Sequence, residues 1–257
     1  MTIIETDRVQ FELRRGRAVK IGDKIFIHPE FLTEEKLREI SIKNPHLIIT
    51  ALRANAITGQ DFSSSQQIDI SSMTLQDVIS IIIGKNNQNI ALQNIEDSSQ
   101  INAALELARI AELLPTIISY DSDEDAPKIE AATILDYKNQ VNQSLRLAAE
   151  TPLKLKHAAK SYIKAFRPAN GGMEHLAIII GDIGDEPLAR VHSSCYTGDL
   201  LASLACDCGD QLSETIKLMD NSGGGIILYL MQEGRGIGLI NKLKAYSVQK
   251  GGLDTVE

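Results

Sequence analysis

All three cysteines of this 257-residue chain, Cys195, Cys206 and Cys208, lie within fourteen residues, so its fold has to account for three thiols confined to one short segment. Thiols used only as small core side chains would be spread along a chain. Three thiolates suit Zn2+, and three protein ligands leave a fourth position for water or substrate, as catalytic zinc sites do. The spacing C-x10-C-x-C leaves two other interpretations open: a strained disulfide between Cys206 and Cys208, or buried thiols.

The odd number of cysteines and the absence of an apolar leader after Met1 predict a reducing, cytoplasmic environment. Disulfides are rare there, and clustered thiols more often hold a metal or take part in chemistry. No stretch is long and apolar enough to cross a membrane, so no membrane partner is expected. These considerations favour zinc over a disulfide.

Composition is that of a globular chain of one or two domains, with 43% hydrophobic and 23% charged residues. A net charge of −8 and the absence of tryptophan argue against nucleic-acid binding, which needs positive charge and stacking surfaces. The acidity lies in the first 150 residues, because residues 151–257 hold 11 Lys and Arg against 12 Asp and Glu. The C-terminal part can therefore hold an anionic ligand in a local basic pocket.

The acidic run over residues 121–127 ends in a proline and lacks the glycine turn and distal carboxylate of a calcium loop, so it is interpreted as a solvated linker. It divides the chain into an N-terminal extension domain of unknown role (1–120), an acidic linker with a connecting helix (121–150) and a C-terminal domain (151–257). In the first of these, His28 and His46 stand alone and are expected to be structural. Its expected elements are helices over 7–16 and 100–114, strands over 19–27 and 47–52, a strand or helix over 79–83, and a mobile loop over 58–67.

Beyond residue 151 the apolar pattern predicts strands that alternate with helical segments. The run 176–180 is typical of a strand buried on both faces, and 188–194 of a strand that leads into Cys195. A helix over 210–219 and a strand over 226–231 follow. The fold class is therefore α/β: a C-terminal mixed sheet with helices, preceded by a smaller α/β domain.

The glycine-rich segment 232–238 is predicted to be a strand-to-helix turn whose backbone N–H groups can receive an anion. Its spacing fits neither the dinucleotide-binding nor the P-loop motif. Arg190, His192 and Ser193 come just before Cys195, and such side chains can hold phosphate oxygens. An ordinary exposed strand edge remains the alternative for any one of them.

Five segments together resemble GTP cyclohydrolase II over about residues 165–257. They are Arg190–Ser193, Cys195–Asp199, Cys206–Gln211, Gln232–Arg235, and Asn241 and Lys242 with Tyr246. The N-terminal part resembles the extension that some bacterial members carry. Residues 12–19 are faintly similar to the opening of 3,4-dihydroxy-2-butanone 4-phosphate synthase, but 21–24 replace the acidic cluster that follows in that enzyme, so synthase activity is not expected.

The resemblance implies the first step of riboflavin biosynthesis: opening of the imidazole ring of GTP, with release of formate and pyrophosphate, to give a diaminopyrimidinone ribosyl phosphate. By position, one zinc ion per chain would be held by Cys195, Cys206 and Cys208 and would activate the attacking water. Tyr246 matches a catalytic tyrosine, with packing on its helix as the alternative role. Members of the family are homodimers. The positions that would contact GTP, its triphosphate and the accompanying Mg2+ are Arg190, Val191, His192, Ser193, Ser194, Gln211, Glu233, Gly234, Arg235 and Thr255.

Two departures from the family pattern lower the catalytic activity that is expected of this chain. Ser194 stands where the family usually has glutamate, which removes a carboxylate contact to metal or phosphate. The sequence also stops at Glu257, before the family's Asp-x-Arg catalytic segment, so a C-terminally truncated chain is expected. One alternative is a catalytically inactive relative that binds only zinc and a nucleotide. Another is a cysteine cluster that only stabilises the fold, next to an N-terminal interaction domain.

Overall fold

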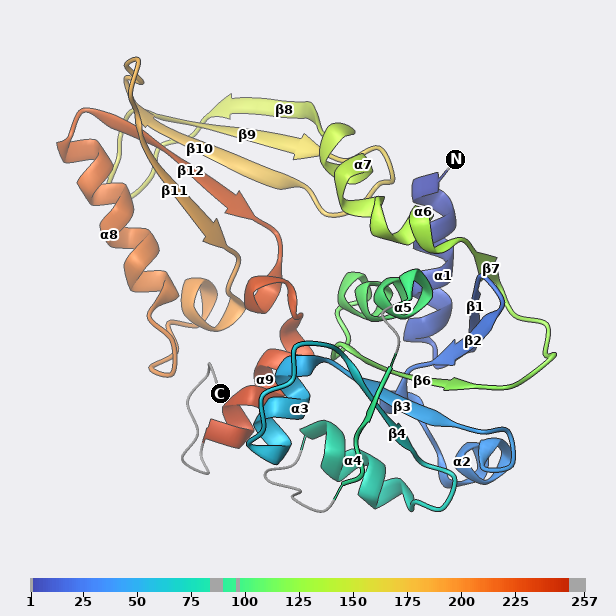
Figure 1. Ribbon diagram of the computed structural model, residues 1–257. Helices are drawn as coiled ribbons and strands as arrows, with labels where there is room; N and C mark the ends of the chain where they lie inside the picture. Colours follow the sequence, from blue (N-terminus) through green and yellow to red (C-terminus); the bar gives the residue numbers. More distant parts are fainter. Residues whose placement is uncertain (1, 84–89, 96–97, 250–257) are drawn as a thin grey trace. The chain divides into compact units, whose positions relative to one another are not determined.

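The structure, a computed structural model, describes residues 2–83, 90–95 and 98–249 (Figure 1). It divides into two compact units, Met1–Lys138 and Asn139–Val248. Each unit has its own β-sheet and its own helices, which confirms the predicted α/β class. No helix among the described residues is both long and apolar enough to span a bilayer.

The N-terminal unit is built on a seven-stranded sheet with the order β5-β4-β3-β6-β2-β1-β7. Neighbouring strands are antiparallel except β1 and β7, which are parallel. The strands are β1 (Val19–Ile21), β2 (Lys24–Ile27), β3 (His46–Ile49), β4 (Gln66–Asp69), β5 (Gln93–Asn94), β6 (Thr116–Tyr120) and β7 (Lys128–Ile129).

Helices cover both faces of this sheet (Figure 1). On one face α1 (Thr2–Arg14), α5 (Ser99–Ile110) and α6 (Ala131–Leu135) pack on alternate strand residues. On the other face lie α2 (Glu34–Ile40), α3 (Ala51–Thr58) and α4 (Leu75–Ile83). The unit is therefore a three-layer α/β/α arrangement with two apolar cores, one on each side of the sheet.

Local signals explain where several predicted elements differ from the observed ones. The predicted strand over 19–27 is a hairpin, because Gly22 adopts a left-handed φ of 63° that turns the chain between β1 and β2. The predicted strand over 47–52 stops at Ile49, since the Thr50 side chain accepts the Arg53 N–H and caps α3. The segment 79–83 is helical, as the end of α4.

Other predicted elements of this unit are present with shifted boundaries. The first helix begins at Thr2 rather than at Asp7, and the helix predicted over 100–114 is α5 with Ser98 as its N-cap. The predicted loop over 58–67 ends where β4 begins at Gln66. Residues 121–127 have no regular structure, and β7, α6, α7 (Tyr137–Gln143) and the start of β8 follow before residue 150.

The two histidines predicted to be structural are held by backbone groups. His28 is buried, accepts the Glu30 N–H at Nδ1 and lies 2.9 Å from the Leu114 carbonyl at Nε2. Its position next to the short 3-10 helix Pro29–Phe31 makes it the N-cap of that turn. The His46 Nδ1 lies 3.0 Å from the Asn44 carbonyl.

The C-terminal unit holds a five-stranded sheet with the order β11-β12-β10-β9-β8. β11 and β12 are parallel and the other neighbours are antiparallel, so the sheet is mixed, as predicted. Helix α8 (Cys208–Asn221) packs on one face (Figure 1). The strands are β8 (Arg146–Pro152), β9 (Ser161–Arg167), β10 (His175–Gly181), β11 (Leu188–Ser193) and β12 (Gly224–Leu230).

The prediction that the run 176–180 is buried on both faces is wrong. Only Ala177 and Ile180 of β10 are buried, and the other residues of the strand are partly exposed. Ile178 and Ile180 point to the α8 side, where they join Met219 and Ile227 in the core. The apolar run therefore reflects a central strand with one well-packed face.

Because β11 and β12 are parallel, their carboxyl ends lie at the same edge of the sheet. The chain leaving β11 forms a five-residue π-helical turn over Tyr196–Leu200. The chain leaving β12 forms a short 3-10 turn over Glu233–Gly236 and then α9 (Leu239–Gln249). This edge collects the cysteine segment, the glycine-rich turn and α9, and in open α/β sheets it is the edge where ligands bind.

Candidate metal centre

The three cysteines meet at this edge of the C-terminal sheet. The Sγ atoms of Cys195 and Cys206 are 3.4 Å apart, and those of Cys206 and Cys208 are 3.1 Å apart. All three sulfurs lie within 4.8 Å of one another, and none of the cysteines forms a disulfide. Cys195 is buried and the other two are half-buried, so the cluster has an inner and an outer side.

This donor set fits zinc. A tetrahedral site with Zn–S bonds of about 2.3 Å needs sulfurs about 3.8 Å apart. The observed spacings of 3.1 and 3.4 Å lie slightly below that value, so small rotations of the cysteine side chains suffice. Only three His, Cys, Asp or Glu ligand atoms converge here among the described residues, which is the ligand count of a site with an open position.

Two glycines let the cysteine segments approach each other. A Cβ on Gly209 would lie 2.3 Å from the Gly198 carbonyl oxygen, and a Cβ on Gly198 would lie 2.9 Å from the Cys208 Cβ. Both distances are too short for real side chains, so larger residues at either position would push the segments apart. Gly198 and Gly209 are therefore needed for the three thiols to approach one another.

Lys242 of α9 and Glu233 of the turn after β12 surround Cys195. The Lys242 Nζ donates to the Cys195 Sγ at 2.8 Å and to the Glu233 Oε1 at 2.8 Å. Both charged side chains are largely buried, with 13% and 7% of their surface exposed. Burial lowers the pKa of Lys242, but its hydrogen bonds to Cys195 and Glu233 outweigh burial and raise the pKa, so the ammonium stays charged.

The thiols of the cluster differ in acidity. Burial raises the pKa of Cys195, but hydrogen bonds from Lys242, from Thr197 and from the Gly198 N–H outweigh it and bring the pKa to about 7. For Cys208, burial and the neighbouring sulfurs act in the same direction and raise the pKa to about 12. One thiolate therefore forms readily near neutral pH, whereas metal binding would have to displace the proton of Cys208.

A carboxylate behind the cluster fixes the backbone of Cys195. Asp199 accepts the Cys195 N–H at 3.0 Å and the Tyr229 hydroxyl at 2.6 Å on Oδ2, and the His192 Nε2 lies 3.4 Å from Oδ1. The His192 and Tyr229 rings are stacked with centroids 5.5 Å apart. Burial, followed by the contact with Asp199, raises the pKa of Tyr229, so its hydroxyl stays a donor.

Arg190 projects from the α8 side of β11 and has an unused donor. Its NH2 group donates to the Gln211 Oε1 at 2.6 Å, and the Gln211 Nε2 donates to Asp207 at 2.6 Å. Its Nε is buried without a hydrogen-bond partner among the described residues. A buried, unpaired guanidinium N–H is costly, so it points to a ligand acceptor that the protein itself does not supply.

The other residues predicted on β11 are only partly gathered at the cluster. Val191 is 65% exposed and alternates to the opposite face of the sheet from Arg190 and His192. The Ser193 hydroxyl accepts the Gln232 side-chain amide at 3.0 Å, and Ser194 is buried with its N–H bonded to the Leu230 carbonyl. The sequence placed these residues together, but their side chains divide between the two faces of the sheet.

The glycine-rich turn has an unusual backbone. Gly234 and Arg235 both adopt left-handed conformations, with φ values of 61° and 59°. For a non-glycine residue this costs roughly 1–2 kcal/mol, and such strain often occurs at functional sites. The Arg235 side chain is exposed at this position. The Glu233 carboxylate, in contrast, points inward and accepts the Tyr196 N–H at 2.7 Å and the Gly234 N–H at 3.1 Å, besides the Lys242 ammonium.

Tyr246 reaches the cluster through Thr197. Its hydroxyl lies 3.2 Å from the Thr197 Oγ1, which in turn lies 3.4 Å from the Cys195 Sγ. A role near the metal ligands is therefore geometrically available to Tyr246. Thr255, the last predicted contact, lies outside the described residues.

Sequence reasoning assigned no role to several residues that the structure brings to the site: Lys242, Asp199, Thr197 and Tyr229. For Lys242 a signal was present, since it lies four residues before Tyr246 and shares a face of the predicted helix with it. Thr197 and Asp199 contact Cys195 within the Cys195–Asp199 segment that the motif had singled out. The contact of Tyr229 with Asp199 depends on the pairing of β11 with β12, which composition and periodicity do not reveal.

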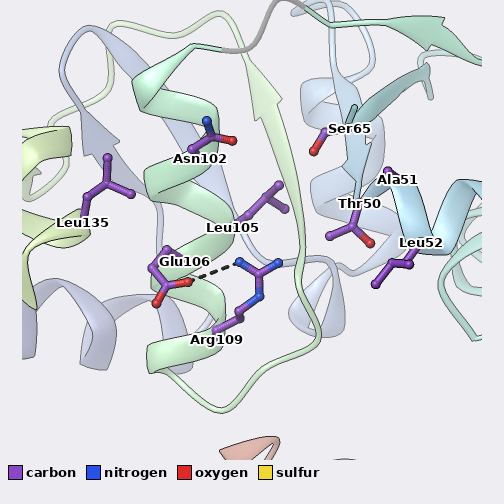
Figure 2. A pocket seen from close by; sticks show the side chains of 9 residues that line it. All are labelled: Thr50, Ala51, Leu52, Ser65, Asn102, Leu105, Glu106, Arg109 and Leu135. Carbon is purple, nitrogen blue, oxygen red and sulfur yellow. Dashed lines mark hydrogen bonds and ion pairs between the residues drawn. The ribbon is translucent and has the colours of Figure 1, made fainter. Parts of the chain in front are cut away.

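A separate hollow of about 410 Å³ lies in the N-terminal unit, between α5, α6 and the start of α3 (Figure 2). Its charged groups are already paired, because Glu106 binds Arg109 at 3.2 Å and Lys138 at 2.7 Å. No cysteine or histidine lines it. The lining residues are Thr50, Ala51, Leu52, Ser65, Asn102, Leu105, Glu106, Arg109 and Leu135.

Comparison with known proteins concerns mainly the C-terminal part of the chain. The family model of GTP cyclohydrolase II matches residues 146–257. The GTP cyclohydrolase-2 of Azospirillum brasilense is 46% identical over an alignment of 177 residues, which covers 63% of this chain and 46% of that protein. Riboflavin biosynthesis protein RibBA of Phocaeicola vulgatus is 54% identical over 94 residues, covering 36% of this chain and 23% of that protein.

The GTP cyclohydrolase-2 of Hahella chejuensis is likewise 54% identical over 94 residues, which cover 36% of this chain and 45% of that protein. The chain thus spans less than half the length of these curated relatives. Among solved structures, RibBX of A. baumannii, a two-domain 3,4-dihydroxy-2-butanone 4-phosphate synthase, has a TM-score of 0.40 and 12% identity over 96% of this chain and 91% of that chain. A likeness of that size identifies neither a fold nor a function.

The fold and the site define the C-terminal unit as an α/β domain whose three cysteines can hold a metal ion. Residues 146–257 match the family model of GTP cyclohydrolase II, and the relatives named above are similar to this part of the chain. The resemblance predicted from the motifs is confirmed, and the family match begins about twenty residues before the predicted residue 165.

Proposed function

We propose that this chain takes part in riboflavin biosynthesis as a zinc-dependent GTP cyclohydrolase II, which hydrolyses GTP with release of formate and pyrophosphate. The observation that carries this proposal is the meeting of three cysteine sulfurs within 4.8 Å at the carboxyl ends of β11 and β12. The family of residues 146–257 and the names of its relatives agree with it.

Cys195, Cys206 and Cys208 would hold the zinc ion, one per chain. When bound, zinc supplies Lewis-acid activation of water near neutral pH, which hydrolysis of an imidazole carbon requires. The chain's own contribution is to keep these ligands in place: Asp199 and Glu233 accept the N–H groups of Cys195 and Tyr196. Tyr246, next to Thr197, would then hold or move a proton at its hydroxyl close to the reacting ring.

The nucleotide phosphates would be received by the basic and N–H groups of the same edge. The buried Arg190 Nε lacks an acceptor among the described residues, and a phosphate oxygen would supply one. Gln211 holds the Arg190 guanidinium, and the exposed Arg235 stands in a strained turn beside the cluster. His192 and the Ser193–Ser194 backbone would line the phosphate-binding edge, with Mg2+ as the counterion of the triphosphate.

Further parts of the proposal follow from the family. They are a GTP contact at Val191 through its backbone, contacts at Gly234 and Thr255, a homodimeric state and a cytoplasmic location. The exposed Val191 side chain makes a backbone contact the more suitable one. Ser194 in place of a carboxylate would weaken binding of the metal-phosphate complex.

The test is formate release from GTP by the purified chain, with zinc content determined on the same sample. Stoichiometric zinc with formate release supports the proposal, and Cys206→Ser should abolish both. Zinc with GTP binding but no formate would instead support the alternative, a metal- and nucleotide-binding relative without catalysis. A sample with neither zinc nor formate would contradict both functions.

A further inference from the structure

Three chain segments meet at one buried ion pair beside the cysteines. Lys242 comes from α9, Glu233 from the turn after β12, and Cys195 from the segment after β11. The Lys242 ammonium bonds both the carboxylate and the sulfur at 2.8 Å. The second carboxylate oxygen of Glu233 accepts the N–H of Tyr196, the residue next to Cys195.

Resting on the zinc site proposed above, we propose that Lys242 is a positioning residue for the metal centre: it compensates the charge of the Cys195 thiolate and ties that ligand to the Gly234–Arg235 turn. A metal bound by three thiolates carries a net negative charge, and a hydrogen-bonded ammonium beside one sulfur reduces its cost in a partly buried site. Groups next to metal ligands orient them and tune the metal in this way.

The burial and contacts of Lys242 exclude a role as a simple surface cation. A lone buried ammonium or carboxylate is strongly unfavourable, so Lys242 and Glu233 have to be satisfied together. The Lys242 ammonium also lies 5.8 Å from the centroid of the Tyr246 ring, on the same helix face. Lys242 therefore contacts, through one side chain, a metal ligand, the turn that carries Arg235 and the tyrosine proposed to act in catalysis.

Lysine suits this place better than arginine would. Its ammonium is a compact point charge with three donors, which can be shared between a sulfur and a carboxylate oxygen. A planar guanidinium would favour the two carboxylate oxygens, one of which is already taken by the Tyr196 N–H. Lys242→Arg should consequently retain the charge but lose the contact to sulfur.

The experiment compares wild type, Lys242→Met, Lys242→Gln and Lys242→Arg with the control Lys160→Met. Lys160 also pairs with a carboxylate, Asp182, in the same unit, but it is 61% exposed and takes part in no cysteine contact. Zinc affinity is measured by competition with a chromophoric chelator. The optical spectrum of the cobalt-substituted proteins is recorded in parallel, because its thiolate-to-cobalt charge-transfer band reports hydrogen bonding to sulfur.

Lys242→Met is expected to lower zinc affinity by roughly 10- to 100-fold. Its charge-transfer band should move to lower energy, since a thiolate without a donor gives up electron density more easily. Lys242→Arg should show the band shift with a smaller loss of affinity, and Lys160→Met should match wild type in both. A variant destabilised only in its fold would lose affinity without moving the band of its folded fraction.

Unchanged affinity and an unchanged band in the Lys242 variants would overturn the inference. Should Lys242→Met not fold, Lys242→Gln and Lys242→Arg provide the same two readouts. These measurements need no GTP, so they separate the two proposals. Metal binding that depends on Lys242 in a chain that does not bind GTP would support the inference and refute the proposed function.

Discussion

The two units of this chain are stabilised in different ways. Among the residues that the structure describes, the N-terminal unit has two apolar cores of 18 and 15 buried residues, one on each side of its sheet. In the described part of the C-terminal unit the buried core cluster has 4 residues, and largely buried polar groups form hydrogen bonds and an ion pair around the cysteines. The first unit is therefore stabilised mainly by apolar burial, whereas the second relies more on polar contacts around three cysteines that could hold a metal ion.

Metal removal should give the largest loss of stability, and it should affect the C-terminal unit far more than the N-terminal unit. A ligand at about 1,000 times its Kd stabilises the folded state by about 4 kcal/mol. In a unit of about 100 residues that corresponds to a fall in Tm of roughly 15–30 °C on chelation. Hydrogen exchange resolved along the sequence should show residues 146–248 opening while residues 2–83 stay protected. Equal protection of both regions with and without chelator would contradict the proposed difference between the two units.

Truncating a core side chain of the N-terminal unit should have the opposite result: this unit should lose stability while zinc binding in the C-terminal unit is unchanged. Leu47 is fully buried in the N-terminal unit, and Leu47→Ala is expected to destabilise that unit by about 3 kcal/mol through lost burial and the cavity that remains. Denaturant unfolding measures the loss. Zinc content should stay at the wild-type level, and a Leu47→Ala protein that has lost its zinc would show that the units are not independent.

Replacing an arginine should lower stability in the N-terminal unit but GTP affinity in the C-terminal unit. Arg53 donates twice to the Ile81 carbonyl, at 2.9 and 2.7 Å, and is part of the N-terminal fold. Arg53→Ala should cost about 1–2 kcal/mol of stability without changing nucleotide affinity. In Arg235→Gly, relief of the left-handed strain offsets the entropy of glycine, so stability should change by less than about 1 kcal/mol.

Arg235→Gly should nevertheless weaken binding of GTP by roughly tenfold or more, because a charged hydrogen bond to phosphate is lost. Isothermal titration with GTP compares the two variants. Equal affinities of Arg235→Gly and wild type would remove Arg235 from the proposed site.

The smallest expected effect is a pH dependence at His175. This residue accepts the Met231 N–H at Nδ1, at 3.1 Å, and burial lowers its pKa below the ordinary value of 6.5. The folded state thus favours neutral histidine, so its contribution is present above pH 6.5 and is lost as the pH falls through and below that value. Partial exposure keeps the effect well under about 1 kcal/mol.

The measurement is the free energy of unfolding of wild type and His175→Asn at pH 7.5 and pH 5.5. Asparagine keeps an acceptor but does not titrate, so the difference between the proteins should shrink or reverse at the lower pH. A difference that is independent of pH would contradict this account of His175.

Sequence patterns predicted those parts of the molecule that depend on neighbours along the chain. The strands around Ile178 and Ile227, helix α8 and the clustering of the cysteines follow from periodicity and from short spacings. Patterns failed where a single residue redirects the backbone, as Gly22 does in the first hairpin and Thr50 at the start of α3. An apolar run cannot show by itself that its strand turns or ends.

The chemistry of the site was only half predictable for a related reason. The motif marked Glu233 as a substrate contact, but both of its carboxylate oxygens are engaged inside the protein. The link from Lys242 to Cys195 joins residues 47 positions apart. Such contacts depend on the parallel pairing of β11 and β12, which places distant segments at one edge of the sheet.

We propose that the three cysteines form an open metal centre. X-ray absorption at the zinc edge of the purified chain tests it most directly. We predict one zinc ion per chain with three sulfur ligands at about 2.3 Å and one lighter ligand, nitrogen or oxygen, in the remaining position. Four sulfur ligands, or a protein that binds no zinc while its cysteines are reduced, would contradict the account.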